Sequence, residues 1–486
     1  MKRNNLLLIV CMFVSLAGIT AGGDSHGTSL TDEFIVNTDT TDADQVKPNI
    51  AAPYLIAWED YRWGSRRIYA QLQPGPFDFE VRPRYLGDDV FTPAVTAKGG
   101  DVGIWVENHN GDNDIYLDRP LYKPDTYCNC KKVNSDEGSH DQRNPDIDSK
   151  ESPYRYIIVW EDNRNGNYEI FGKMYAYPCF AYVDDFQASP YVGSAVNKSN
   201  PSVAINHSGD FVVVWEDDRD NGYIYGQRYN SECEPVGNLF QVNDYVAYQH
   251  GPPKFPKVGI DHFGNFVVVW VDSRDHQWLQ LYDIYAQRYD SSGVPQGGNF
   301  RVNQTVASAD LIPPAVGMEP WGSFVVTWRR GIYWQGSWLF DIYARKYNPL
   351  GVALGDNYKV NTDTEDASQT NPTIAIYHPG WYSWYEDAEI YYAWQDYRIP
   401  EKGWDVYAKI EPWPVRYVPG DANGNGIVNS ADVTYLINYL FSGGPPPRPL
   451  NAGDPNADCS INSADVVCLT NYLFRGGPAP QPGCVE

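Results

Sequence analysis

The chain has 486 residues, 15% of them aromatic, and a formal net charge of −25 at pH 7 from 37 basic and 62 acidic side chains. That length exceeds one ordinary compact domain, but it suits a repeat architecture followed by a further domain. So acidic a chain would be repelled by phosphates, which argues against a nucleic-acid partner, whereas the acidity is compatible with bound calcium.

Residues 1–22 combine a basic start at Lys2 and Arg3, an apolar run, and small residues between Ala17 and Gly22. This pattern predicts a secretory signal peptide, because the apolar run is too short for a helix that spans a membrane. No later segment is apolar enough to predict a membrane span. We therefore expect a secreted mature protein that is extracellular or attached to a cell surface.

One hairpin pattern recurs along residues 33–412. In its clearest copy, Phe211 to Tyr229, an apolar run ends in Trp215, an Asp-, Asn- and Gly-rich turn follows, and a second strand ends in Tyr229. The apolar run suits a strand buried on both faces. Its tryptophan returns at spacings of 47 to 66 residues, as Trp58, Trp105, Trp160, Trp215, Trp270, Trp328 and Trp394. This period predicts a mainly β fold, a seven-bladed β-propeller over residues 33–412.

Four strands are expected in each blade, and the last blade shows how the ring closes. In blade 4 the expected strands are Pro201 to Ile205, Phe211 to Trp215, Tyr223 to Tyr229 and Phe240 to Asn243. Blade 7 lacks the fourth of these, but Phe34 to Asn37 supplies a matching segment at the start of the chain. Residues 37–45 also resemble residues 361–369, which follow the outer strand of blade 6. We therefore expect the N-terminal strand to complete blade 7 and leave no free edge there.

Five blades place Asp two residues and Arg four residues after the tryptophan. A catalytic acid repeated around a ring has little use, so these pairs predict a charge-assisted hydrogen bond that fixes a turn. Blade 2 departs from the pattern with Glu107 and His109, and blade 6 with Arg330 and Ile332. The five pairs are Asp60/Arg62, Asp162/Arg164, Asp217/Arg219, Asp272/Arg274 and Asp396/Arg398.

Five further tryptophans are not required by the repeat and fall in the expected loops between strands 2 and 3. Those loops belong to blades 1, 5, 6 and 7, which ring closure makes contiguous. Clustered exposed indoles are typical of a binding surface, since flat rings stack on sugars or anchor a partner protein. The alternative is that these loops bury their own tryptophans. The candidate ligand-binding residues are Trp63, Trp278, Trp334, Trp338 and Trp404.

The composition changes after blade 7, where residues 413–419 are expected to be a linker. Residues 420–447 and 453–480 are near-copies, each with oxygen-bearing side chains at the spacing of a calcium loop followed by a short helix. The first loop offers Asp421, Asn423, Asn425, the Ile427 carbonyl, Asn429 and Asp432. The second offers Asp454, Asn456, Asp458, the Ser460 carbonyl, Asn462 and Asp465. Residues 420–486 therefore predict a small α-helical domain that binds two Ca²⁺ ions.

These two loops closely resemble a type I dockerin domain, a duplicated calcium module that docks enzymes onto cohesin domains. The resemblance implies a cohesin-like partner that contacts loop positions 10 and 11, here Ser430, Ala431, Ser463 and Ala464. Two residues depart from the pattern. Cys459 replaces the glycine at position 6 of the second loop, which implies a strain of roughly 1 kcal/mol, and Cys468 stands where the first repeat has Tyr435.

Eight cysteines are present, of which Cys11 lies in the predicted signal peptide. Secreted proteins commonly form disulfides, but connectivity does not follow from sequence. Cys484 lies in a Gly- and Pro-rich tail that can fold back, so we predict a Cys459–Cys484 bond and a free Cys468. A Cys128–Cys130 metal or redox site is disfavoured, because no His or Cys partner stands at ligand spacing.

Two functions remain open for the propeller, which resembles secreted bacterial propellers with Trp-Glu-Asp-x-Arg repeats and, more distantly, the Tol-system periplasmic propeller. Dockerin-bearing chains are commonly polysaccharide-degrading enzymes, so a glycoside hydrolase or lyase is one alternative. No H-E-x-x-H or sialidase-type box is present, and no catalytic residue is identified. We favour a non-catalytic propeller that binds a glycan or a protein.

Overall fold

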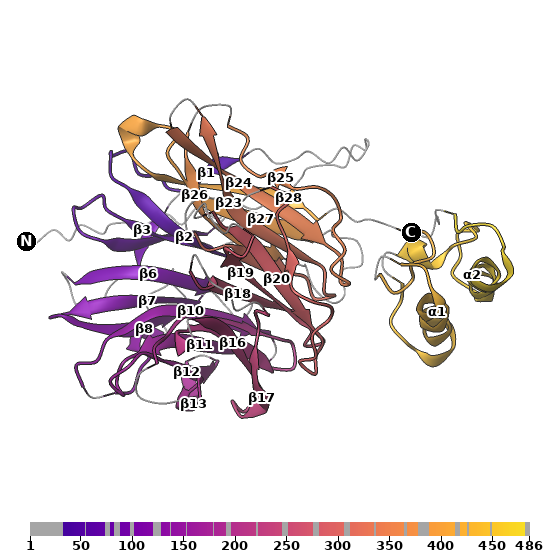
Figure 1. Ribbon diagram of the computed structural model, residues 1–486, viewed down its shortest axis with the longest axis horizontal. Helices are drawn as coiled ribbons and strands as arrows, with labels where there is room; N and C mark the ends of the chain where they lie inside the picture. Colours follow the sequence, from indigo (N-terminus) through magenta and orange to yellow (C-terminus); the bar gives the residue numbers. More distant parts are fainter. Residues whose placement is uncertain are drawn as a thin grey trace, which may run out of the picture.

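Seven four-stranded sheets follow one another along the chain and form the propeller (Figure 1). The computed structural model describes residues 33–481 apart from 54, 73–77, 82–87, 98–101, 120–127, 137, 152, 178, 191–195, 220–221, 245–250, 276–280, 306–311, 335–336, 364–366, 378–387, 414–417, 425–426 and 448–449. The predicted signal peptide lies outside the described residues. The first strands of neighbouring blades contact one another in turn, and the first strand of blade 1 contacts that of blade 7, so the ring is closed.

Each blade is built in sequence order, except that blade 7 takes its fourth strand from the start of the chain. Blades 1 and 2 consist of β2 (Gln45–Ala51), β3 (Leu55–Asp60), β4 (Arg67–Leu72), β5 (Phe79–Val81), β6 (Asp89–Thr96), β7 (Val102–His109), β8 (Asp112–Arg119) and β9 (Cys128–Lys132). Blades 3 and 4 consist of β10 (Gln142–Lys150), β11 (Arg155–Asp162), β12 (Glu169–Ala176), β13 (Phe180–Gln187), β14 (Lys198–Ile205), β15 (Phe211–Asp217), β16 (Tyr223–Tyr229) and β17 (Pro235–Gln241).

The remaining blades follow the same plan. Blades 5 and 6 consist of β18 (Lys254–Ile260), β19 (Phe266–Asp272), β20 (Asp283–Tyr289), β21 (Phe300–Arg301), β22 (Ala315–Met318), β23 (Phe324–Trp334), β24 (Ser337–Tyr347) and β25 (Tyr358–Lys359). Blade 7 consists of β26 (Gln369–Tyr377), β27 (Glu389–Asp396), β28 (Asp405–Pro412) and β1 (Phe34–Ile35). A short 3-10 helix, η2 (Pro400–Lys402), lies between β27 and β28.

The repeated tryptophans fill the spaces between blades. All seven are at most 1% exposed, and β15, which carries Trp215, is buried along its whole length as its apolar run predicts. Each indole packs against the preceding blade: Trp215 with Ile157 and Val159 of blade 3, and Trp58 with Tyr391 of blade 7. Because the blades share these cores, no blade buries its apolar surface alone, which explains why the repeat keeps the tryptophan.

The N-terminal strand closes the ring, as predicted. β1 pairs with β28 in antiparallel register, with Phe34 opposite Ala408 and Ile35 opposite Tyr407. The Val36 N–H continues the ladder by donating to the Val406 carbonyl at 2.8 Å. Glu33 adds an ion pair with Arg398. The first strand in the sequence is therefore the outer strand of the last blade.

The five Asp/Arg pairs fix turns, as predicted. In blade 1, Asp60 accepts hydrogen bonds from the Arg62 backbone N–H at 2.9 Å, from its guanidinium at 2.7 Å, and from Trp58 Nε1 at 3.1 Å. The guanidinium then stacks on Tyr69 of the third strand at 3.9 Å. The same Asp–Arg contact and Arg–aromatic stack recur in the other four blades that carry the pair. Aspartate, arginine and aromatic ring thus form one structural unit.

The residue directly after the tryptophan links neighbouring blades, which the sequence did not indicate. Glu216 Oε1 accepts the Phe255 N–H of blade 5 at 2.7 Å, and Glu161 Oε1 accepts the Asn200 N–H of blade 4 at 2.7 Å. Phe255 and Asn200 have φ values of 56° and 49° and precede a proline at a β-bulge. The glutamates therefore hold backbone that is in the left-handed region, a conformation costly for these residues.

Several strand boundaries in blade 4 differ from those expected, and the second strand ends at Asp217 instead of Trp215. The first strand begins at Lys198 instead of Pro201, because the bulge lets the ladder continue on both sides of the proline. The fourth strand is Pro235–Gln241 instead of Phe240–Asn243. Asn243 lies beyond the ladder and accepts the Ile224 N–H at 2.8 Å through its side chain.

Two helices follow the propeller and belong to none of its sheets (Figure 1). Helix α1 (Ser430–Ser442) and helix α2 (Ser463–Arg475) begin at capping boxes and end at left-handed glycines, Gly443 and Gly476. They pack around Leu436 and Leu469, with a short 3-10 helix, η3 (Leu450–Gly453), between them in sequence. Trp413, the first residue of the expected linker, is buried with residues of blades 6 and 7.

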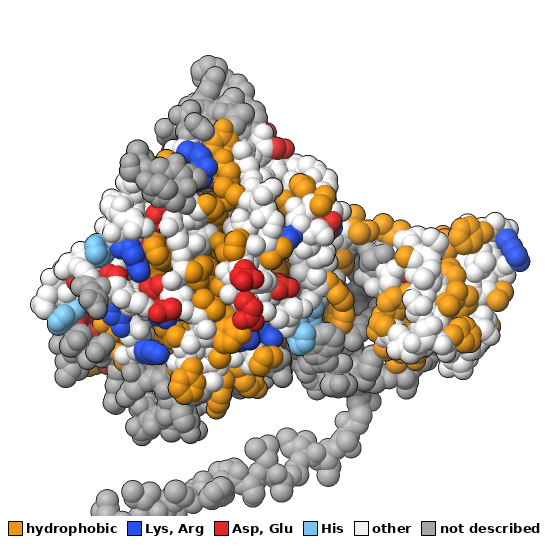
Figure 2. Space-filling model, turned by 90° about the horizontal axis from the view of Figure 1, so that it is seen from below, with side chains coloured by type: hydrophobic (Ala, Val, Ile, Leu, Met, Phe, Trp, Pro, Cys, Tyr) orange, Lys and Arg blue, Asp and Glu red, His pale blue; other side chains and the backbone are white. Residues whose placement is uncertain are grey.

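None of the described helices is long and apolar enough to cross a bilayer. On the face shown in Figure 2, Lys and Arg side chains are scattered between acidic and apolar ones.

Candidate calcium loops and ligand surfaces

The first calcium loop joins its two ends through Asp432, at position 12. Asp432 Oδ1 accepts the Asn423 N–H at 3.1 Å and Oδ2 accepts the Asn429 N–H at 2.8 Å. Asp421 and Asp432 are 4% and 0% exposed. Burial raises the pKa of Asp432. Asn425 lies outside the described residues, so its place in this loop stays a prediction.

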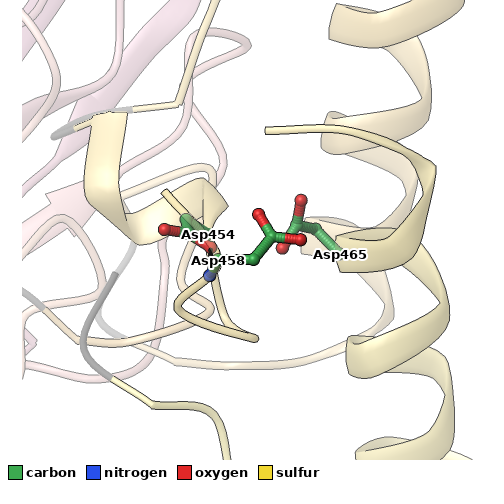
Figure 3. A group of neighbouring side chains, drawn as sticks. All are labelled: Asp454, Asp458 and Asp465. Atoms are coloured by element: carbon green, nitrogen blue, oxygen red, sulfur yellow. Dashed lines mark hydrogen bonds between the residues drawn. The ribbon is translucent and has the colours of Figure 1, made fainter. Parts of the chain in front are cut away.

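The second calcium loop gathers three carboxylates. Oxygens of Asp454, Asp458 and Asp465 lie within 4.8 Å of one another, with Asp454 and Asp465 buried and Asp458 exposed (Figure 3). Asp454 Oδ1 accepts the Asp458 N–H at 3.1 Å, and the Asn462 N–H bonds to Asp465 Oδ2 at 2.8 Å. Hard oxygen ligands in such a group suit Ca²⁺.

The three neighbouring carboxylates repel one another, and a bound cation would relieve this repulsion. Burial raises the pKa of Asp465 to about 6, and the neighbouring carboxylates of Asp454 and Asp458 add to the shift. A bound Ca²⁺ would reverse the repulsion and favour the ionised acids. The residues present therefore fit the ion that the sequence predicts.

Cys459 occupies the tight turn of the second loop. Its φ is 62°, in the left-handed region that favours glycine, and its N–H donates to Asp454 Oδ2 at 3.0 Å. Cys459 is disulfide-bonded and Cys468 carries a free thiol. The predicted partner, Cys484, lies outside the described residues, so the pairing stays a prediction. The Gln481 N–H bonds to the Pro455 carbonyl at 2.8 Å, which returns the tail to this loop.

The four residues expected to contact a partner lie at the N-terminal ends of the two helices. Ser430 and Ala431 begin α1, Ser463 and Ala464 begin α2, and all four are exposed. The exposed face continues along each helix. On α1 it includes Thr434, Ile437 and Phe441, and on α2 it includes Val467 and Phe474. Phe441 and Phe474 are 69% and 65% exposed, so each helix ends in a largely exposed aromatic side chain.

Three of the five candidate ligand-binding tryptophans have described side chains, and all three are accessible. Trp63 is 71% exposed and donates to the Tyr69 hydroxyl at 2.9 Å, Trp338 is 40% exposed, and Trp404 is half-buried. They occur where strands 2 and 3 of blades 1, 6 and 7 connect, so they lie on one face of the ring. Trp278 and the Trp334 side chain lie outside the described residues.

The connection in blade 6 is not the loop that was expected. The ladder between β23 and β24 continues as far as Trp334 opposite Ser337, so Trp334 and Trp338 are strand residues of a long hairpin. This segment is rich in aromatic and aliphatic residues, which favour extended pairing over a loop. Trp338 stacks on Phe340, with ring centres 6.2 Å apart.

A cleft at the junction of blades 7 and 1 contains Trp404. The cleft has a volume of about 540 Å³ and is lined by Asp42, Asp44, Ser368, Tyr397, Pro400, Glu401, Gly403 and Trp404. The Tyr397 and Trp404 rings are 5.2 Å apart, and Asp44 Oδ1 accepts the Trp404 N–H at 3.1 Å. We call this the Trp404 cleft.

Sequence reasoning found Trp404 but missed the other residues of the cleft. Tyr397 directly follows the Asp396 of the repeated pair, and Asp42 and Asp44 lie in the segment that resembles residues 361–369. Ring closure brings these segments together, so a signal was present in the predicted pairing of the two ends of the propeller.

Comparison with known proteins identifies the C-terminal region. Residues 419–474 match the family model of the dockerin type I domain. No curated protein matches the chain. Among solved structures, an α-L-arabinofuranosidase from Fusarium graminearum is similar at 11% identity and a TM-score of 0.44, covering 79% of this chain and 98% of that one.

Two further solved structures are similar at the same low level. An α-L-arabinanase from Penicillium chrysogenum has 12% identity and a TM-score of 0.40, covering 79% of this chain and 98% of that one. TolB from Acinetobacter baumannii has 12% identity and a TM-score of 0.33, covering 53% of this chain and 56% of that one. Likeness at this level says nothing about activity. The chain is a seven-bladed β-propeller that carries a type I dockerin domain at its C-terminus.

Proposed function

We propose that this is a secreted protein that binds carbohydrate through its propeller and docks onto a cohesin-type partner through its calcium-loaded C-terminal domain. The docking half is supported by the match to the dockerin model and by the exposed helix faces that begin at Ser430 and Ser463. Calcium in both loops would fix the start of each helix, since Asp432 and Asp465 are at once the twelfth loop position and the N3 residue of a capping box.

Calcium binding is tested by calorimetric titration of the full chain. Two sites are expected, and Asp454→Ala should remove one of them and lower the thermal stability gained from calcium. Asp184→Ala is the matched control, because Asp184 is an exposed propeller acid away from both loops. Loss of neither site in the Asp454 variant would contradict the assignment. Capture on immobilised cohesin modules should require calcium and be reversed by EDTA.

The Trp404 cleft carries the proposal for the propeller. Two aromatic rings at an open cleft, with carboxylates and Ser368 around them, offer a stacking surface together with acceptors for hydroxyl groups. Trp63 and Trp338 extend aromatic surface on the same face of the ring. A protein ligand is the other occupant that such a surface fits.

The experiment is a pull-down of the full chain with a panel of insoluble polysaccharides, scored for binding and for released reducing sugar. The double variant Tyr397→Ala/Trp404→Ala should lose binding, whereas Phe180→Ala, an exposed aromatic on the outer strand of blade 3, should keep it. Binding unchanged in the double variant would refute the proposal.

Glycoside hydrolysis is the second candidate, because Asp42, Asp44 and Glu401 line the same cleft. Hydrolysis of a glycosidic bond uses two carboxyl groups, one as acid and one as base or nucleophile. Release of reducing sugar that is lost in Glu401→Gln would replace the binding proposal with this one.

A further inference from the structure

An axial channel runs between the innermost strands of the seven blades. Its middle section, a cavity of about 200 Å³, is lined by residues of the first strand of every blade. One mouth is ringed by Pro48, Pro93, Pro145, Pro201, Pro256, Pro314 and Pro372. The Trp404 cleft lies at this end, because the Gln45 N–H at the start of β2 donates to the Trp404 carbonyl. The second mouth lies at the other end, where the first strands finish and turn into the second ones.

Aromatic side chains from three consecutive blades gather at the second mouth. His207 follows β14, His262 follows β18 and Trp321 follows β22. The rings of His207 and His262 are 5.2 Å apart, and those of His262 and Trp321 are 6.1 Å apart. Phe263, which is 61% exposed, lies 5.8 Å from Trp321. We call His207, His262, Phe263 and Trp321 the second-mouth platform.

The turns that carry the platform are held by their own hydrogen bonds. Asn206 Oδ1 accepts the N–H groups of Gly209 and Asp210, both at 3.0 Å. Asp261 Oδ1 accepts the N–H groups of Phe263 and Asn265, both at 2.8 Å. Because the backbone is fixed before any ligand arrives, binding here would cost little ordering entropy.

The cavity beside the platform is small and has a polar side. Its volume of about 130 Å³ corresponds to roughly four water molecules. Lys150 and Glu151 of blade 3 and Tyr377 of blade 7 also line the cavity, and these two blades flank the three that carry the aromatic residues. Blade 3 thus presents a charged turn where blades 4 to 6 present rings, so the aromatic cluster is not imposed by the repeat itself.

We propose that the second mouth of the channel binds a single sugar ring of a neutral saccharide. The apolar C–H face of the ring would stack on His262 and Trp321, and hydroxyl groups would reach Lys150 and Glu151. The lining carries one lysine, Lys150, and two acids, Glu151 and Asp261, and Asp261 is already bonded within its own turn. This mixture of charges matches an uncharged polyhydroxylated ligand better than a charged one. The cavity beside the platform is too small for a sugar chain to enter, so we expect recognition of a chain end or a monosaccharide that stacks at the mouth. This site is separate from the Trp404 cleft and does not depend on it.

The test uses the full chain in calcium and saturation-transfer NMR with glucose, galactose, mannose, xylose, arabinose, cellopentaose and xylopentaose. Affinity for a saccharide that binds should fall at least tenfold in His262→Ala/Trp321→Ala. Phe263→Ala, at an exposed position, should weaken binding severalfold without affecting folding, and it covers the case in which the double variant does not fold. Phe180→Ala is the control for loss of an exposed aromatic residue.

Each outcome decides between the two sites. Loss of binding in the second-mouth variants, with binding retained in Tyr397→Ala/Trp404→Ala, supports the proposal. Binding that is lost only in Tyr397→Ala/Trp404→Ala overturns it and leaves the Trp404 cleft as the saccharide site. Absence of binding by every saccharide in the panel also overturns it.

Discussion

The Asn37 side-chain amide donates a hydrogen bond to Asp405 Oδ1 at 2.9 Å, although 368 residues separate them. Asn37 also accepts the Val406 N–H at 2.8 Å. Asn303 makes the same two contacts within blade 5, to Asp283 and to the Ile284 N–H. The closing blade is therefore held by the side-chain network that the other blades use internally.

Asn37→Ala should destabilise the propeller, because it leaves buried polar groups of β28 without their partner, a cost of about 1–3 kcal/mol. Asn303→Ala removes the same contacts at a place where the strand remains covalently continuous with its blade. We expect a lower Tm and faster proteolysis near the N-terminus for Asn37→Ala than for Asn303→Ala. Equal losses of Tm in the two variants would show that the closing blade is no less stable than blade 5.

The Asp/Arg pairs predict a loss of stability in acid. Burial raises the pKa of Asp162, but hydrogen bonds from Arg164 and Trp160 outweigh this effect, so the pKa is lowered overall. A lowered pKa in the folded state contributes stability above the unfolded pKa near 4, and this stability is lost as the pH falls through the folded value.

Asp162→Asn should therefore lower the Tm at pH 6 and narrow its difference from the wild-type chain below pH 4. Thermal unfolding monitored by circular dichroism at pH 6, 4 and 3 measures both. A difference in Tm that is independent of pH would contradict the charge-assisted role.

Glu319 predicts the opposite dependence. It is buried at the turn between β22 and β23, and desolvation raises its pKa to about 8. The folded state then holds a proton that the unfolded chain has lost, so stability falls as the pH rises from about 4.5 to 8. Glu319→Gln should remove this dependence and stabilise the protein at pH 8 by on the order of a few kcal/mol.

The check is the Tm of both proteins at pH 5, 7 and 9. The curves should converge at pH 5 and separate at pH 9. Asn206, which occupies the same turn position in blade 4, shows that a neutral side chain is compatible with this turn. A wild-type Tm that rises from pH 5 to 9 relative to the variant would refute the assignment.

The disulfide in the second calcium loop is predicted to join Cys459 to Cys484. Non-reducing peptide mapping should recover this pair, and iodoacetamide should label Cys468 after denaturation without reductant. Reduction should weaken calcium binding in the second loop more than in the first, since Cys459 donates its N–H to Asp454. Recovery of a Cys468–Cys484 peptide would show the pairing wrong.

The repeat made most of the fold predictable, because a feature that occurs seven times averages out local ambiguity. Trp215 predicted its buried strand, and the segment after Phe34 predicted its pairing partner. The link from Glu216 to the Phe255 N–H was hidden, since it joins side chain to backbone across two blades and has no periodic hydrophobic signal.

Of the candidate sites, the calcium loops could be predicted from the sequence and the second-mouth platform could not. The calcium loops lie in short contiguous segments, so residue spacing identified Asp454, Asp458 and Asp465 before their contact was known. The platform of His207, His262 and Trp321 is assembled from three turns of three blades, and only their arrangement around the axis brings them together.

Because β1 pairs with β28, the ring can close only after nearly the whole propeller has been synthesised. Phe34 emerges from the ribosome before any blade exists, and its partner Ala408 is made only after all seven tryptophan strands. Until then the chain carries an unpaired strand at one end and an open blade at the other. Contacts this distant in sequence slow folding, and an open strand edge invites pairing with another chain. A nascent molecule is thus most exposed to misassembly just before its final blade is complete.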